Sequence, residues 1–498
     1  MTTINPLIFR AYDIRGIAIP EAGEIADLTP ETVKLIGQGT GTYMKRKYGT
    51  RNMMVGRDNR LHSPDLQKAF IEGVLSTGID VVDVGISTSP LIYYAVCRYG
   101  MDSGVNITAS HNPKEYNGVK IVGKNAHSVC GDELQEIVKL ILANDFERQD
   151  EQQAEHTTKS DNFDDYLKDI QARIKLAKPL KVVVDAGNGV TGPFAPKLLR
   201  AIGCKVIELY CDLDGNFPHH EANPEEEKNM LDLAEQVRIN KADLGIGFDG
   251  DGDRVGIVDE NGKHYSADYL LLLLVRDLLE NVNSAKVAKA SASDTTPNNN
   301  LASNSAKQIV FDVKVSKILI DEITRLGGTP VMSKTGHSFI EARMHELNAP
   351  LGGEISGHMF FGKTYYDYYG FDDAFFAACK LLEILSKTQK SFSEQFNGLP
   401  TLFTTPEFKA HCPDNLKFEI VKKVTDHFTK LYDCITIDGV RINFDTLAWG
   451  AIRCSNTSPN LTLRFEAETA EKLAQIQNIM VEELKKYPEV DLSWHKTT

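Results

Sequence analysis

The chain has 498 residues, of which 42% are hydrophobic and 25% charged, and a formal net charge of −14. This length exceeds that of one typical domain, so we expect a soluble protein of several packed domains. The negative charge disfavours nucleic acid or an anionic membrane as the main partner, because phosphate-rich surfaces repel it. The longest apolar run, Tyr269 to Val275, is too short to span a bilayer. Eight cysteines without a CxxC pair predict reduced thiols and a cytoplasmic location.

Three segments of the chain repeat one plan: an apolar strand, an amphipathic helix, a turn with glycine and a second strand. They begin at MMVGRD (residues 53–58), VVVDAGNG (residues 182–189) and IVFDV (residues 309–313). Their turn glycines, residues 78, 203 and 328, are 125 residues apart. A period of this size predicts three related α/β domains in tandem, although common strand-helix-strand patterns can also coincide by chance.

The segment after about residue 373 does not follow that plan. It opens with an apolar helix (374–385), contains the strand-like runs ITIDGVRINF and NLTLRFEA, and ends in a helix (470–486) with Thr469 as its N-cap. These elements predict a smaller α+β closing domain. The stretch 291–305, rich in Ser, Thr and Asn, predicts an exposed, mobile loop within the third domain.

The most informative segment is IGFDGDGDRVGIVDE, in which three aspartates alternate with glycines. The glycines allow a tight turn that points Asp249, Asp251 and Asp253 at one centre. Hard oxygen ligands at this density favour Mg²⁺ or a similar cation, because three uncompensated carboxylates repel one another. A solvated acidic turn is the weaker alternative.

This aspartate loop has two rival interpretations. An EF-hand calcium loop is excluded by Arg254, which occupies the sixth loop position where glycine is needed, although Glu260 falls at the twelfth. The preceding run LGIGF also predicts a strand rather than a helix. The second alternative stays open at this point: Asp249 as the phosphoryl-accepting nucleophile of a magnesium-dependent sugar phosphatase.

A second candidate segment, NITASHNPKEYNGVKIV, places Ser110 between a β-prone run and a turn rich in hydrogen-bonding side chains. An exposed nucleophile fits such a turn, although Ser110 and His111 alone are equally consistent with an ordinary turn. Phosphoryl transfer needs a nucleophile, a metal ion on the moving group and cations that offset charge. Ser110, the aspartate loop and the cations Lys120 and Arg254 supply all three, so together they predict this chemistry.

Two further loops carry polar side chains that suit a sugar phosphate. GGEISGH (residues 352–358) offers Glu354 and Ser356 to vicinal sugar hydroxyls. RCSNTSPN (residues 453–460) is a turn rich in donors that can cradle a phosphate. Its donors are Arg453, Ser455, Asn456, Thr457 and Ser458. An ordinary polar turn is the alternative for each segment.

The motifs TASHNP, DGDGDR, GEISGH and RCSNTSPN, with FRAYDIRG at residues 9–16, resemble in kind and order those of the α-D-phosphohexomutase family, bacterial phosphomannomutase/phosphoglucomutase branch. The resemblance covers nearly the whole chain. It implies an α/β fold: three tandem related α/β domains plus a C-terminal α+β domain, similar to the TATA-binding protein, around a central cleft. We expect these domains at residues 1–152, 153–258, 259–371 and 372–498.

The resemblance also implies a role for each matching residue. Ser110 corresponds to the phosphoserine, and its phosphate completes a metal site formed by Asp249, Asp251 and Asp253. The other catalytic positions are Arg15, Lys120, Arg254 and His337, of which Lys120 and His337 are candidates for proton transfer. The implied substrate-binding positions are Tyr12, Lys314, Glu354, Ser356, His358, Arg453, Ser455, Asn456, Thr457 and Ser458.

The implied reaction interconverts hexose 1-phosphate and hexose 6-phosphate with Mg²⁺, through the phosphoserine and a hexose 1,6-bisphosphate that turns around in the cleft. The run SNTSPN, in place of the SGTEP of amino-sugar members, favours mannose and glucose phosphates. The expected partners are therefore small hexose phosphates, and the protein is expected to be a monomer or weak oligomer. Two alternatives remain: the Asp249 phosphatase, and a catalytically silent relative that binds sugar phosphates.

Overall fold

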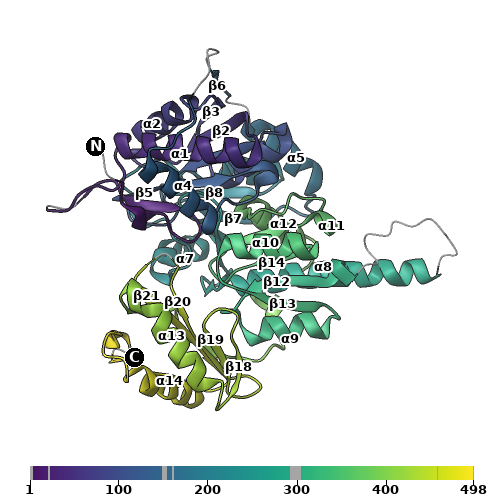
Figure 1. Cartoon of the computed structure of the whole chain (residues 1–498). Helices are drawn as coiled ribbons and strands as arrows, with labels where there is room; N and C mark the ends of the chain where they lie inside the picture. The colour runs from purple at the N-terminus through teal and green to yellow at the C-terminus, as the bar shows by residue number, and fades with distance from the viewer. Residues whose placement is uncertain are drawn as a thin grey trace.

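The computed structural model of the chain describes residues 4–20, 23–148, 154–159, 162–291, 304–456 and 458–496. Most of the stretch 291–305, where a mobile loop is expected, lies outside these residues, and so does Thr457. The described residues form four sheets that follow one another along the chain, with helices packed on them (Figure 1). In this part of the chain, no helix combines the length and apolar character that a membrane span requires.

The first sheet is built around a central strand with parallel neighbours on both sides. Its strands are β1 (Ile14–Ile17), β2 (Asn52–Arg57), β3 (Asp80–Ile86), β4 (Ser103–Ile107), β5 (Tyr116–Val122) and β6 (His156–Thr158). They are ordered β1-β5-β4-β2-β3-β6, with β2 parallel to β3 and β4, and β4 antiparallel to β5. The helices of this domain are α1 (Pro30–Tyr48), α2 (Ser63–Leu75), α3 (Ser89–Tyr99) and α4 (Asp132–Ala143).

The second and third sheets repeat this arrangement. The second domain contains β7 (Lys181–Asp185), β8 (Lys205–Leu209), β9 (Leu244–Phe248), β10 (Val255–Val258) and β11 (His264–Tyr265), with α5 (Asn162–Arg173), α6 (Ala195–Ala201) and α7 (Leu231–Asn240). The third contains β12 (Gln308–Asp312), β13 (Thr329–Ser333), β14 (Leu351–Gly353) and β15 (Met359–Phe361), with α8 (Ala267–Ser291), α9 (Lys317–Arg325), α10 (His337–Leu347) and α11 (Lys363–Tyr366). The orders β8-β7-β9-β10 and β13-β12-β14-β15 match β3-β2-β4-β5 of the first sheet. The three related α/β domains predicted from the repeat are therefore confirmed.

The turn glycines of the repeat occupy equivalent places in the first two domains, and in the third domain the left-handed glycine comes one residue earlier. Gly78 (φ 82°) and Gly203 (φ 109°) have left-handed backbone between the helix and the second strand, a conformation that favours glycine. In the third domain the left-handed residue is Gly327 (φ 74°). Gly328 serves close packing instead, since a Cβ there would lie 2.8 Å from Leu279 Cδ1.

The fourth sheet is antiparallel and has a different topology. Its strands are β16 (Phe403–Thr404), β17 (Phe408–His411), β18 (Asp433–Ile435), β19 (Val440–Asn443), β20 (Trp449–Cys454) and β21 (Asn460–Ala467). They are ordered β16-β21-β20-β19-β18, and β17 also pairs with β21. Apolar side chains of α13 (Asp414–Phe428) and α14 (Ala470–Leu484) pack on the sheet. Thr469 caps α14 as predicted, because its side chain accepts a hydrogen bond from the Lys472 N–H.

The apolar helix α12 (Ala374–Ser386) packs with the first three domains and not with the fourth sheet. Its side chains, Phe375 and Leu382 among them, lie in one apolar cluster with residues of α8, β10 and β15. The cluster of the fourth sheet begins only at Ala410. The helix therefore buries its apolar surface in the preceding domains, whereas the sequence pattern places it at the opening of the closing domain, at residue 372.

Candidate active site

The Ser110 loop follows β4, at the carboxyl end of the central strands of the first sheet. Ser110 is 2% exposed and adopts left-handed backbone (φ 51°), which a non-glycine residue holds only when its surroundings enforce it. Its N–H donates to Thr108 Oγ1 at 2.9 Å. Its hydroxyl donates to Asp249 Oδ2 at 2.6 Å and lies 3.2 Å from His111 Nδ1. The serine of the first domain thus faces the aspartate loop of the second.

The aspartate loop turns sharply between β9 and β10 around the side chain of Asp249. Asp249 Oδ1 accepts hydrogen bonds from the N–H groups of Gly252, Asp253 and Arg254 at 2.9, 3.1 and 3.1 Å. These bonds close the turn that the alternating glycines predict. Gly250 brings the loop against the serine, since a Cβ at this position would lie 2.3 Å from the Ser110 carbonyl oxygen.

The three carboxylates of the loop converge on one centre. Asp249, Asp251 and Asp253 are fully buried and bring ligand atoms within 4.8 Å of one another. Oδ1 of Asp251 and Oδ1 of Asp253 are buried without a hydrogen-bond partner among the described residues. Buried carboxylate oxygens of this kind are costly unless a cation binds them. The residues present therefore fit a hard divalent cation, with the Ser110 side chain beside it.

Lys120, on β5, places a positive charge next to these carboxylates. Its ammonium lies 2.7 Å from Asp251 Oδ2 and also pairs with Asp253. Burial lowers the pKa of Lys120, but the two aspartates outweigh it and raise that pKa well above its usual value. Burial, followed by repulsion from Asp253, raises the pKa of Asp249 well above its usual range. Burial also raises the pKa of Asp253, but the charge of Lys120 outweighs burial and holds this pKa well below its ordinary value.

A chain of buried groups connects the aspartate loop to the third domain. Arg254 Nε donates to His358 Nε2 at 2.9 Å, and His358 Nδ1 lies 2.7 Å from Asp372 Oδ2. Because a guanidinium can only donate, His358 is neutral here and carries its proton on Nδ1. Burial lowers the pKa of His358 to about 3 and raises that of Asp372 to about 7. The ring of His337, at the start of α10, stacks on His358 at a centroid distance of 5.4 Å.

The GGEISGH loop joins β14 to β15 in the third domain. Glu354 is buried, and its Oε1 accepts a hydrogen bond from the Gly336 N–H at 2.6 Å. Burial, followed by repulsion from Asp312, raises the pKa of Glu354 to about 8. Ser356 is half-buried two residues later. A carboxyl that is protonated near neutral pH both donates and accepts hydrogen bonds, as does the serine hydroxyl, and sugar hydroxyls need both.

The RCSNTSPN segment, called the donor turn here (residues 453–460), joins β20 to β21 in the fourth domain. Arg453 is buried, and its Nε donates to Asp438 Oδ2 at 2.6 Å. Its Nη2 has no hydrogen-bond partner in the part of the chain that the structure describes. The hydroxyl oxygens of Ser455 and Ser458 lie 2.8 Å apart. The turn therefore gathers a guanidinium and two hydroxyls at one place.

Tyr12 of the first domain connects the donor turn to the third domain. Its hydroxyl donates to the Thr335 carbonyl and accepts a hydrogen bond from Asn456 Nδ2 of the donor turn. Its ring meets the His337 ring edge-on at a centroid distance of 5.6 Å. Side chains of the first, third and fourth domains therefore meet around one tyrosine.

Two further predicted cations border the same region. Arg15, on β1, donates to the Ala109 carbonyl and to Asn112 Oδ1, the latter at 2.9 Å, so it holds the serine loop. Lys314 is buried where the third and fourth domains meet, and its ammonium lies 2.5 Å from Glu407 Oε2. The structure thus brings the predicted residues of all four domains together, with Thr457 outside the described residues.

The structure also adds residues that sequence reasoning did not find. Glu407 pairs with Lys314, and Asp372 holds His358. Lys417 lies beneath the donor turn, and Arg60 donates to carbonyls of the serine loop. At Arg60 the one available signal is a charged residue in the turn that follows an apolar strand. The others lie outside any recognisable motif and act on a partner that is distant in sequence.

A buried serine beside a carboxylate cluster, with a donor-rich turn in a separate domain, is the arrangement of a phosphoryl-transfer enzyme. The chain belongs to the phosphoglucomutase/phosphomannomutase family. Its models for alpha/beta/alpha domains I, II and III match residues 6–148, 164–262 and 266–403, and the model of the C-terminal domain matches residues 407–483. The resemblance, the fold and the enzyme class expected from the sequence, an isomerase, are confirmed.

Named relatives and a solved structure agree with this assignment. The phosphomannomutase/phosphoglucomutase of Pseudomonas aeruginosa is 40% identical over 484 residues, which are 97% of this chain and 96% of the relative. The phosphoglucomutase of Neisseria meningitidis is 37% identical over 481 residues, 96% of each chain. A crystal structure of a phosphoglucomutase/phosphomannomutase family protein from Burkholderia thailandensis superposes with a TM-score of 0.83 at 35% identity, covering 97% of this chain and 98% of that one. The Asp249 phosphatase alternative finds no support in these relatives.

Proposed function

We propose that the chain interconverts the 1-phosphate and 6-phosphate of mannose, glucose or both, through a phosphoserine at Ser110 and a hexose 1,6-bisphosphate. One observation carries the proposal: the Ser110 hydroxyl lies 2.6 Å from Asp249 in a buried carboxylate centre. A serine in this place has a cation site directly beside the group that it would transfer. The family supports the reaction class, and the names of the relatives support these two sugars.

The aspartate loop is the proposed magnesium site. Asp249, Asp251 and Asp253, with a phosphate oxygen on Ser110, would hold Mg²⁺. The bound ion would neutralise charge on the phosphoryl group. Lys120 pairs with the same carboxylates and adds a positive charge at this end of the site.

Two bond exchanges complete the proposed reaction. In the first, a hydroxyl oxygen of the sugar bonds to phosphorus while the bond from phosphorus to Ser110 Oγ breaks, and the hydroxyl proton passes to a base. In the second, Ser110 Oγ bonds to the phosphorus of the other phosphate while the bond from that phosphorus to the sugar oxygen breaks. The proton then returns to this sugar oxygen. The Arg15 guanidinium donates to Asn112 in the serine loop, and that of Arg254, a residue of the aspartate loop, donates to His358, so both would offset charge during both steps.

His337 is the better of the two candidate bases. Burial lowers its pKa, although Asp372 opposes this, so its imidazole is neutral near pH 7 and can accept a proton. Lys120 is held as an ammonium by Asp251 and Asp253, so it acts as a cation or as a proton donor. We therefore assign proton acceptance to His337 and the role of cation or proton donor to Lys120, a distinction that the sequence did not make.

The donor turn is the proposed grip for the phosphate that does not react. Arg453 with Ser455, Asn456, Thr457 and Ser458 would hold this phosphate, assisted by Lys314 and Tyr12. Glu354, Ser356 and His358 would contact the ring. Because one set of loops serves both orientations of the bisphosphate, the same residues fit either end of the sugar.

Phosphorus NMR tests the proposal directly. The protein is incubated with Mg²⁺, a trace of glucose 1,6-bisphosphate and either mannose 1-phosphate or glucose 1-phosphate, alongside a Ser110→Ala variant. We expect conversion to the 6-phosphate that collapses in the variant, and the two rates rank the sugars. Free phosphate released equally by the variant contradicts the proposal in favour of Asp249 as nucleophile. Binding without turnover of either sugar indicates the silent relative.

We also propose a domain boundary, a cellular location and an oligomeric state for the chain. The packing of α12 favours a boundary between the third and fourth domains after residue 400, later than the expected 371. A cytoplasmic location fits the eight free cysteines, four of them buried. A monomer or weak oligomer stays a prediction, to be checked by light scattering.

A further inference from the structure

Arg60 lies directly behind the Ser110 loop because of the topology of the first sheet. Strand β2 is parallel to β4, with Arg57 opposite Ile107, so the two strands end side by side. The turn after β2 carries Arg60, and the loop after β4 carries Ser110. Arg60 is 1% exposed, so its guanidinium is desolvated and must find partners within the protein.

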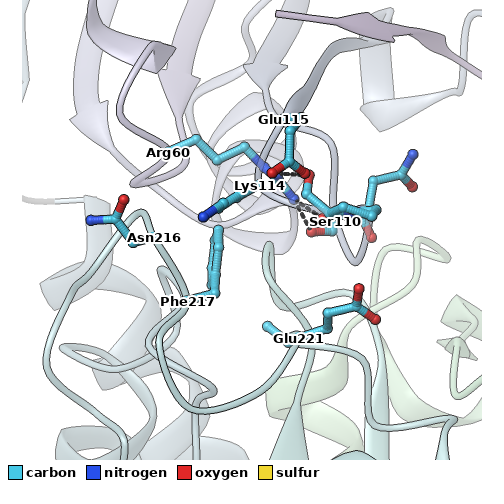
Figure 2. A pocket seen from close by; sticks show the side chains of 10 residues that line it. Arg60, Ser110, Lys114, Glu115, Asn216, Phe217 and Glu221 are labelled. Carbon is cyan, nitrogen blue, oxygen red and sulfur yellow. Dashed lines mark hydrogen bonds between the residues drawn. The ribbon is translucent and has the colours of Figure 1, made fainter. Parts of the chain in front are cut away.

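Every donor of this guanidinium is used, and four of the five bonds go to the backbone of one loop. Nη2 donates to the carbonyl oxygens of Ser110 and Asn112 at 2.9 and 2.6 Å. Nη1 donates to those of Pro113 and Tyr116 at 2.6 and 3.1 Å. Nε donates to the carboxylate of Asp58, in the same turn as Arg60. Figure 2 shows the side chain reaching from its own turn into the serine loop.

Asp58 and the second domain fix the guanidinium in its place. Asp58 Oδ2 accepts from Arg60 Nε at 3.1 Å, and Asp58 Oδ1 accepts from the Arg60 N–H and from the Ser63 hydroxyl. On the other side, the ring of Phe217 lies 5.2 Å from the guanidinium carbon. The group is thus oriented from both domains that contribute to the reacting centre.

The loop needs such a support because packing does not supply it on this face. A cavity of about 240 Å³ borders the loop, lined by Ser110, Lys114 and Glu115 on one side and by Asn216, Phe217 and Glu221 on the other (Figure 2). The left-handed backbone of Ser110 (φ 51°) is unfavourable for a non-glycine residue and needs support from its surroundings. The carbonyls that Arg60 fixes in direction add a constraint on this conformation to those from Arg15 and Asp249.

We propose that Arg60 is a positioning residue for phosphoryl transfer, which fixes the carbonyls of residues 110, 112, 113 and 116 and thereby aims the Ser110 Oγ at the aspartate loop. The inference rests on the proposed function, since it assigns to Ser110 the role of nucleophile. Lysine cannot replace arginine here, because one ammonium has three donors and no planar fork to span four carbonyls.

The test compares Arg60→Lys with the control Arg57→Lys. The Arg57 side chain is half-buried, and its guanidinium donates to the carbonyl of Asp58 and, among the described residues, to no carbonyl of the serine loop. We expect Arg60→Lys to lower kcat about 100-fold, the cost of a misplacement near 1 Å, with KM close to the wild-type value. We also expect the phosphorus NMR signal of phosphoserine 110 to shift or broaden in Arg60→Lys and to keep its position in Arg57→Lys.

The measurements on Arg60→Lys distinguish a positioning role from a general structural role. Wild-type kcat and an unchanged phosphoserine signal in folded Arg60→Lys overturn the inference, and so does a joint change of kcat, KM and Tm, which indicates general loss of structure. If Arg60→Lys does not fold, Asp58→Asn decides, with an expected loss of about tenfold in kcat for one weakened charged hydrogen bond. A wild-type protein that neither turns over nor forms phosphoserine refutes the proposed function itself, which separates the two failures.

Discussion

The ammonium of Lys417 lies beneath the donor turn and donates to the carbonyl oxygen of Ser455 at 2.6 Å. It also donates to the Ser458 carbonyl at 3.0 Å and pairs with Asp414 at 2.7 Å. Asp414 is reached in turn by Arg10 of the first domain at 3.4 Å. A single lysine on α13 therefore fixes the backbone of the donor turn, and an ion pair connects its partner to the domain that carries Ser110.

Replacing Lys417 with methionine is expected to weaken substrate binding and to leave the chemical step largely intact. Charged hydrogen bonds of this kind contribute about 1.5–3 kcal/mol, so KM for the hexose phosphate should rise at least about tenfold. The matched control is Lys423→Met, on the same helix, where the lysine is exposed and pairs with Glu419 of its own helix. Steady-state kinetics would contradict the prediction if both variants had the wild-type KM.

Lys120→Met tests the charge balance of the carboxylate centre. Without the ammonium, Asp251 and Asp253 are buried beside each other uncompensated, and breaking such a pair costs about 3–5 kcal/mol. We expect the chelator-treated variant to melt well below the wild type, and Mg²⁺ to raise its Tm more than that of the wild type. Lys124→Met, two residues beyond the same strand and exposed, is the control. An equal magnesium response in all three proteins would refute this expectation.

Gly250→Ala tests the contact between the serine loop and the aspartate loop. The added Cβ would lie 2.3 Å from the Ser110 carbonyl oxygen, a backbone atom that cannot turn away. We expect loss of about 1–3 kcal/mol of stability and a large fall in kcat as the loops separate. At Gly123 the nearest heavy atom to a new Cβ is 3.7 Å away, so Gly123→Ala should change neither. Thermal melts and initial rates of the two variants provide the comparison.

The buried Glu354 predicts a specific dependence of stability on pH. Burial raises its pKa to about 8 in the folded protein, against 4.5 in the reference state, so the folded state binds the proton more tightly. This contribution to stability is therefore complete below pH 4.5 and is lost as the pH rises towards about 8. The Tm of wild type relative to Glu354→Gln should fall across this window. A difference that stays constant with pH for Glu354→Gln would refute the assignment.

Much of the fold and part of the site could be predicted because they depend on local sequence. Strand-helix-strand segments repeat with glycine turns, and glycines between the aspartates determine the tight turn around Asp249. The placement of α12 could not be predicted in this way. An apolar helix has the same sequence pattern whichever domain it packs against. Only the packed structure shows that Phe375 lies with the preceding domains.

The supporting residues of the site were invisible to sequence reasoning for a different reason. Arg60 and Lys417 act on backbone carbonyls, which every residue has, so their partners leave no pattern in the sequence. The partner of Lys314, Glu407, is 93 residues away and in another domain. Such pairs depend on how the domains meet, which the spacing of motifs along one chain does not specify.

The order of the four loops along the chain has a consequence for synthesis on the ribosome. The serine and aspartate loops emerge first, and the donor turn between β20 and β21 emerges almost last. A nascent chain therefore completes its reactive end before the segment proposed to retain the far phosphate. Translation that stops early leaves a protein with the proposed nucleophile but without the segment proposed to hold the far phosphate, so we expect that only the complete chain retains the proposed bisphosphate intermediate.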